Sequence, residues 1–175
     1  MSGRIKHILF VCTGNICRSP FAEGLLKKLV QKKGLNDIVI DSAGLLALPG
    51  NNATILAQKV AAEYDVYLSD HISKSVKEDI VNRSDFILVM ENSHAKDLLY
   101  AFPEAEDKVF LIRRFARFGS QDRGIADPYG LNYEAYRSCF LDIQDGVSGL
   151  TEYLSGRTFM LKPGKTKSRV FTLDG

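Results

Sequence analysis

Short apolar runs alternate with longer helical patterns along this chain of 175 residues, and that alternation strongly restricts its fold. Four runs have the length and composition of buried strands, at residues 5–12, 38–40, 86–90 and 108–112. Apolar residues at helical spacing occupy residues 19–34, 54–64, 75–84, 93–100 and 132–154. Strands that alternate with helices build a parallel sheet covered on both faces. We therefore expect an α/β fold, with a four-stranded parallel sheet flanked by helices.

The composition fits one ordinary globular domain, with 45% hydrophobic and 25% charged residues. No apolar run approaches the roughly 20 residues of a membrane span. Arg4, Lys6 and His7 interrupt any signal-peptide pattern near the N-terminus. The chain has only three cysteines, an odd number that does not make a disulfide framework. We expect a cytoplasmic protein with free thiols and no membrane partner.

Charge is distributed unevenly along the chain. Residues 156–175 contain five basic side chains and one acidic one, whereas residues 1–155 contain 18 basic and 20 acidic ones. A body with a slight negative balance does not present a basic nucleic-acid surface. We predict one domain at residues 1–155 and a basic C-terminal tail at 156–175, whose role the sequence does not indicate.

The segment after the first apolar run has the residues of an anion-binding loop. Gly14 permits a close backbone approach, and Asn15 tolerates the left-handed region. The loop leads into a helix, whose N-terminus attracts anions, and Arg18 supplies a planar fork for two phosphate oxygens. Such a setting favours the thiolate form of Cys12, to which the Ser19 hydroxyl can donate a hydrogen bond. A lone cysteine is more often a small buried residue, but this spacing favours a nucleophile aimed at a phosphate ester.

The sequence CTGNICRS at residues 12–19 resembles the signature loop of low-molecular-weight protein tyrosine phosphatases. DSAG at 41–44, DFILVM at 85–90 and DPY at 127–129 extend the resemblance over roughly residues 4–155. It implies the Rossmann-like phosphotyrosine phosphatase I fold. It also implies hydrolysis of phosphotyrosine in a phosphorylated protein substrate, through a cysteinyl-phosphate and without a cofactor. Phosphate and vanadate would be inhibitory anions, and we assume a monomer.

The resemblance also assigns roles to individual residues. Cys12 would attack phosphorus, Arg18 would hold the phosphate oxygens, and Asp127 would protonate the leaving oxygen and later activate water. A carboxyl that must be protonated beside a dianion predicts activity at mildly acid pH. The predicted substrate-binding residues are Thr13, Gly14, Asn15, Ile16, Cys17 and Tyr129. The predicted supporting residues, which hold the loop by hydrogen bonds, are Ser19, Ser42 and His71. Three histidines without ligand spacing predict no metal site.

Other activities remain open on the sequence. Related arsenate reductases carry further cysteines near the third strand, where residues 80–90 have none. Protein arginine phosphatases carry threonine where this chain has Ile16. Many tyrosine-specific members carry an aromatic residue in the loop that corresponds to residues 45–49 and a second one directly after DPY. This chain has no aromatic residue at 45–49 and has Gly130 at the second position. The substrate slot could therefore be shallow, with Tyr133 as a candidate second wall. A non-catalytic phosphoprotein-binding module is a further alternative, although nucleophile, arginine and acid are all present.

The two other cysteines have different expected roles. In the family that the chain resembles, the second loop cysteine forms a reversible disulfide with the nucleophile under peroxide, a role that Cys17 could fill. Its alternative role is that of a small side chain in the loop. Cys139 lies on the apolar face of the last predicted helix, so we expect it in the core.

Overall fold

The computed structural model describes residues 4–156 and contains one parallel sheet of four strands. The strands are β1 (His7–Cys12), β2 (Val39–Gly44), β3 (Phe86–Val89) and β4 (Val109–Leu111), in the spatial order β2-β1-β3-β4. All three neighbouring pairs are parallel. The predicted fold class is confirmed, and all but one residue of the predicted tail lie outside the described residues.

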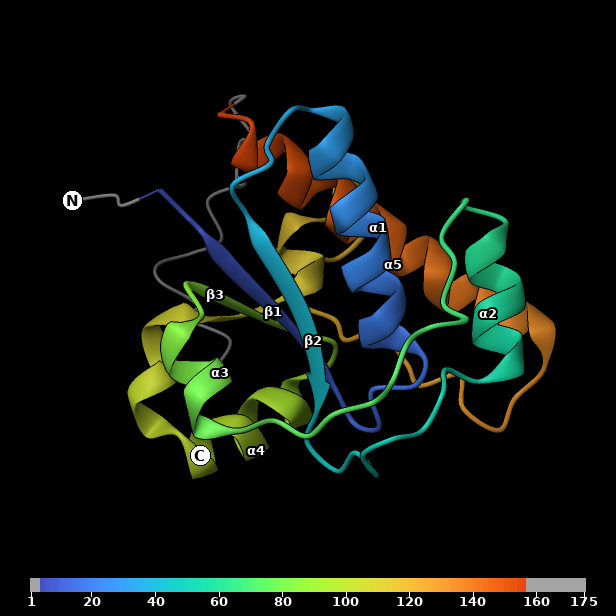
Figure 1. Cartoon of the computed structure of the whole chain (residues 1–175), viewed down its shortest axis with the longest axis horizontal. Coiled ribbons are helices and arrows are strands. Elements are labelled where there is room, and N and C mark those ends of the chain that lie inside the picture. Colours follow the sequence, from blue (N-terminus) through green and yellow to red (C-terminus); the bar gives the residue numbers. More distant parts are fainter. Residues whose placement is uncertain (1–3, 157–175) are drawn as a thin grey trace.

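Helices cover both faces of the sheet (Figure 1). One side carries α1 (Arg18–Lys32) and α5 (Tyr133–Leu154), with α2 (Ile55–Ala62) packed against α5. The other side carries α3 (Glu78–Arg83) and α4 (Asn92–Ala101). The 3₁₀ helices η1 (Pro103–Lys108) and η2 (Ile112–Phe115) flank β4. No helix in residues 4–156 is long and apolar enough to cross a membrane.

Burial on both faces explains why residues 8–12 of the first strand are all apolar. All six residues of β1 are buried, and successive side chains point to opposite faces. Ile8, Phe10 and Cys12 belong to the core beneath α1 and α5, which also includes Cys139 as predicted. Leu9 and Val11 belong to the core beneath α3 and α4.

Most helix boundaries differ from the sequence prediction by one to three residues, and one of these differences has a clear structural cause. The helix expected at 75–84 spans only Glu78–Arg83, because the chain before it pairs with the end of β2. The Gly44 amide donates to the Lys74 carbonyl at 2.9 Å, and the Val76 amide donates to the Gly44 carbonyl at 3.0 Å. The helix expected at 19–34 spans Arg18–Lys32, with Cys17 as its N-cap residue.

The order of the strands places the end of β1 at a change of direction. From β1 the chain crosses to β2 on one side and then returns to β3 on the other. The chain therefore leaves the carboxyl ends of β1 and β3 in opposite directions. Open α/β sheets bind their ligands in the crevice beside such a pair of strands. Cys12, the last residue of β1, lies at that position.

Candidate active site

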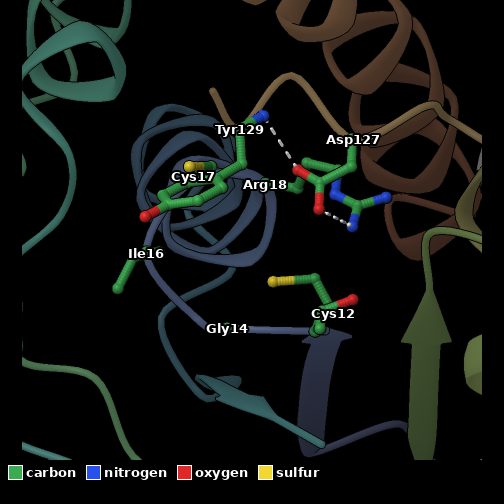
Figure 2. Close-up of a pocket in the computed structure, with 8 residues that line it drawn as sticks. Cys12, Gly14, Ile16, Cys17, Arg18, Asp127 and Tyr129 are labelled. Carbon is green, nitrogen blue, oxygen red and sulfur yellow. Dashed lines mark hydrogen bonds and ion pairs between the residues drawn. The ribbon is translucent and has the colours of Figure 1, made fainter. Parts of the chain in front are cut away.

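A pocket of about 170 Å³ opens at the end of β1 (Figure 2). Its lining comes from the loop after β1, from the first residue of α1 and from the segment that precedes α5. The lining residues are Cys12, Thr13, Gly14, Ile16, Cys17, Arg18, Asp127 and Tyr129. Tertiary structure thus brings together every predicted catalytic residue and all the predicted binding residues except Asn15, which is fully buried behind the loop.

The Cys12 sulfur points into this pocket from its floor, between Asp127 and Arg18 on one side and Ile16 and Tyr129 on the other (Figure 2). The Ser19 hydroxyl lies 2.9 Å from the sulfur, and the Asn15 amide donates to it at 3.3 Å. Hydrogen-bond donors next to a helix N-terminus stabilise a charged sulfur. The arrangement is suited to a thiolate nucleophile.

Asn15 braces the loop from behind. Its side-chain amide donates to the Ser19 hydroxyl at 2.8 Å and to the Ser42 hydroxyl at 2.9 Å, and its side-chain oxygen accepts from the Lys74 amide at 3.0 Å. His71 Nε2 lies 2.7 Å from the Asn15 carbonyl. Together with the bond from its backbone amide to Cys12, these contacts satisfy every polar group of a buried residue whose φ is 55°, in the left-handed region. The predicted supporting residues therefore meet at one point.

The carboxyl end of β2 presses directly against this loop. A Cβ placed on Gly44 would lie 2.6 Å from the Thr13 carbonyl oxygen and 2.9 Å from the Asn15 amide. Such distances leave no room for a side chain, so the close approach requires glycine. On the same strand, the Ser42 hydroxyl donates to Glu23 of α1.

Arg18 is almost fully buried and has three partners that fix its guanidinium. Nη1 donates to the Ile125 carbonyl at 2.8 Å and lies 3.4 Å from Glu91 Oε2. Nη2 lies 3.2 Å from Asp127 Oδ2. A buried cation needs such partners. They come from segments some 70 to 110 residues away, and no local sequence pattern indicated Glu91 or Ile125.

Asp127 and Tyr129 occupy the mouth of the pocket. Asp127 Oδ1 accepts a hydrogen bond from the Tyr129 amide at 3.1 Å, and its other oxygen faces Arg18. The Tyr129 ring is 63% exposed and forms an apolar wall with Ile16. Tyr133 does not line the pocket, and the Arg137 guanidinium lies 6.0 Å from the centre of its ring.

Thr13 has a partner that sequence reasoning missed. Its hydroxyl lies 2.9 Å from Nε2 of His94, a buried residue of α4. Burial and the nearby charge of Arg18 lower the pKa of His94 to about 4, so the ring is neutral near pH 7. His94 Nδ1 has no hydrogen-bond partner among the described residues. An unpaired lone pair on Nδ1 costs less free energy than an unpaired N–H group there would. The favoured tautomer therefore carries its proton on Nε2 and donates it to the Thr13 hydroxyl.

Cys17 lines the pocket, but its sulfur contacts two residues that do not line it. Its sulfur lies 3.3 Å from the Tyr136 hydroxyl and 3.5 Å from that of Thr54. Burial raises the pKa of the Cys17 thiol despite these two hydrogen bonds. All three cysteines are free thiols, so a disulfide between Cys12 and Cys17 stays a prediction. Within residues 4–156, no three His, Cys, Asp or Glu side chains group as a metal site would require.

Comparison with known proteins connects this geometry with a family. The model of the family described as "Low molecular weight phosphotyrosine protein phosphatase" matches residues 7–158. A protein-arginine-phosphatase of Geobacillus stearothermophilus is 35% identical over 148 residues, which cover 85% of this chain and 95% of that protein. A probable low molecular weight protein-tyrosine-phosphatase of Erwinia amylovora is 38% identical over 151 residues, with 86% and 99% covered.

A solved structure adds a chemical observation. It is an arginine phosphatase variant in which a serine replaces the active-site cysteine and is phosphorylated. It superposes with a TM-score of 0.79 at 29% identity, covering 89% of this chain and 99% of that one.

Proposed function

Because the chain belongs to the low molecular weight phosphotyrosine protein phosphatase family, we propose that it hydrolyses phosphotyrosine in proteins through a cysteinyl-phosphate intermediate. The observation that carries the proposal is the convergence of a thiol, a guanidinium and a carboxyl on one small pocket. These groups come from three parts of the chain, and together they provide a nucleophile, an anion clamp and a proton donor.

In the first step, the Cys12 thiolate attacks phosphorus. The loop amides and the Arg18 fork hold the nonbridging oxygens, and they bind the charge of the transition state more strongly than that of the ground state. Positioning and electrostatic stabilisation account for most of catalysis in phosphoryl transfer. The phosphorylated serine in the arginine phosphatase variant supports attack from this position, since that serine replaces a cysteine.

Asp127 acts on the leaving oxygen. Without substrate its carboxylate pairs with Arg18 at 3.2 Å. A bound phosphate dianion would take over the guanidinium, and turnover requires that the freed Asp127 carboxyl, having taken a proton from solvent, faces the leaving oxygen. Asp127 then protonates the departing phenolate, and afterwards it removes a proton from the water that hydrolyses the cysteinyl-phosphate. This sequence favours activity at mildly acid pH.

The pocket walls support phosphotyrosine as the substrate. Ile16 and Tyr129 offer apolar surfaces to a flat ring. A phosphoarginine guanidinium in the same place would turn N–H donors towards Ile16, which has no acceptor, and an unpaired buried donor is unfavourable. Arginine phosphatase activity is the second candidate, since relatives with that name are 35% and 32% identical to this chain.

Release of phosphate from two peptides with the same flanking residues tests the proposal. One carries phosphotyrosine and the other phosphoarginine, and both are measured from about pH 5 to 8 with the wild type, Cys12→Ser and Asp127→Ala. We expect phosphotyrosine turnover that Cys12→Ser abolishes and that Asp127→Ala lowers by about 100-fold or more. A preference for phosphoarginine would refute phosphotyrosine as the substrate and identify the protein as an arginine phosphatase. Vanadate binding without any turnover would indicate a binding module instead.

A further inference from the structure

We propose that Arg113 is a positioning residue for proton transfer, because it folds residues 116–125 into an arch that holds Asp127 over the pocket. The proposal rests on the proposed role of Asp127 as the proton donor. Arg113 lies in η2, immediately before the arch, and does not line the pocket.

The arch is wrapped around the buried side chain of Arg113, which donates hydrogen bonds to two of its carbonyl groups. Arg113 is 2% exposed, and Nε donates to the Ser120 carbonyl at 2.9 Å while Nη2 donates to the Phe118 carbonyl at 2.7 Å. Nη1 donates to Asp142 of α5 at 2.8 Å. A Cβ on Gly119 would lie 3.0 Å from Nη2, and Gly119 has a φ of +72°, so the chain winds closely around the guanidinium. One buried cation thus determines the path of the arch.

The outer half of the arch is attached to α5. Asp145 accepts from the Arg117 amide at 3.2 Å and from the Phe118 amide at 3.1 Å. Asp142 also accepts from Arg123 at 2.7 Å. Asp142 and Asp145 are three residues apart, so they lie on the same face of the helix. The arch therefore has a rigid support that is independent of the pocket.

The inner half of the arch leads directly to the catalytic groups. The Ile125 amide donates to the Met90 carbonyl at 2.7 Å, and the Ile125 carbonyl accepts from Arg18 at 2.8 Å. Asp127 follows two residues later. A Cβ on Gly124 would lie 3.2 Å from Glu91 Cα, so the chain is also held closely against the start of α4. Without its buried cation the arch would keep the bonds to Asp145, but it would lose the contacts that hold the turn at residues 118–120 and tie that turn to Asp142.

The Cys12 loop depends on other contacts. Ser42, His71 and the Lys74 amide hold it through Asn15, and none of these lies in the arch. Arg18 does contact the arch, but at the Ile125 carbonyl, where Met90 rather than Arg113 holds the chain. Loss of Arg113 should therefore impair protonation of the leaving group far more than nucleophilic attack. Dependence of the rate on the leaving group separates these two effects.

The test compares phenyl phosphate, whose leaving oxygen needs a proton, with 2,4-dinitrophenyl phosphate, whose leaving group departs as an anion. We expect Arg113→Met to lower the ratio of kcat/KM for phenyl phosphate to kcat/KM for 2,4-dinitrophenyl phosphate by roughly tenfold or more. The reason is that displacing a catalytic group by about 1 Å can lower the rate by about 100-fold. The inhibition constant of inorganic phosphate should stay within about threefold of the wild type. The ratio does not depend on the fraction of folded enzyme, so a partly unfolded variant still gives an answer.

Arg117→Met is the matched control. Its guanidinium is half exposed and lies 3.6 Å from Asp145, and its backbone amide keeps its bond to that carboxylate. It should leave the ratio unchanged. Asp142→Asn is a second test variant, because it keeps the shape of the side chain but removes the charge that pairs with Arg113, and it should lower the ratio in the same direction.

The outcomes separate this proposal from the proposed function. If Asp127→Ala lowers the ratio while Arg113→Met and Asp142→Asn do not, the positioning role is refuted and the proton donor stands. Equal losses on both substrates in Arg113→Met would also refute the positioning role. If Asp127→Ala itself leaves the ratio unchanged, the proton-donor role fails, and this proposal fails with it.

Discussion

Replacing His94 with glutamine is expected to make the stability of the protein less sensitive to acid. In the folded protein, burial is the main reason that the pKa of His94 is lowered from 6.5 to about 4, and the Arg18 charge adds to it. Asp127 and Asp97 act in the opposite direction but do not reverse the shift, and Glu91 lies 3.5 Å from Nε2. The ring therefore stays neutral in the folded state at a pH where the unfolded chain binds a proton.

The sign and size of the effect follow from that difference in bound protons. Between pH 6.5 and pH 4 the unfolded state binds more protons, so the free energy of unfolding falls as the pH falls. Each pKa unit corresponds to about 1.4 kcal/mol, so the loss from this one group reaches about 3 kcal/mol by pH 4. Above pH 6.5 both states carry a neutral ring, and the penalty is absent.

Urea unfolding followed by circular dichroism at several values between pH 7 and pH 4.5 measures the effect, since the chain contains no tryptophan to report by fluorescence. Glutamine can place a donor near Nε2 and keep the contact with Thr13, but it does not titrate. The difference in stability between wild type and His94→Gln should therefore shift in favour of the variant as the pH falls. Parallel stability curves for the two proteins would refute a buried neutral histidine.

Two further predictions concern β2. Gly44→Ala places a methyl group against the Thr13 carbonyl, 2.6 Å away before any relaxation. We expect it to displace the anion-binding loop and lower kcat/KM by about 100-fold, with weaker competitive inhibition by vanadate; wild-type values for both would contradict the close approach. Asp41 is partly desolvated, which raises its pKa, but His7 and Lys74 outweigh this and lower it to about 2. Its stabilisation is therefore present above about pH 4 and lost towards pH 2. Asp41→Asn should be less stable at pH 7 and lose less stability over that acid range in thermal unfolding, and an equal acid loss in both proteins would disprove the assignment.

Local pattern was sufficient to predict the sheet and to place Cys12 at the end of its first strand. The run through β1 predicted a doubly buried strand, because near-continuous apolar runs are typical of parallel sheets that are covered on both faces. The spacing from Cys12 to Arg18 predicted the anion loop, because residues of one turn between a strand and a helix are held close by the chain itself. The short helix α3 was overestimated, since pairing of residues 74–76 with Gly44 is a contact between distant segments.

The sequence by itself determined the α/β class, the position of the thiol at the end of β1 and, through its motifs, the place of Asp127 in a long loop. Only the tertiary structure decided which partners surround those groups. Glu91, His94 and the Ile125 carbonyl approach the loop from positions 73 to 107 residues away along the chain, and Arg113 bonds both to α5 and to the arch that precedes Asp127. Contacts of this kind carry no local pattern, because their residue types are common in loops and helices. They exist only because the packing of the helices on the sheet brings those segments together.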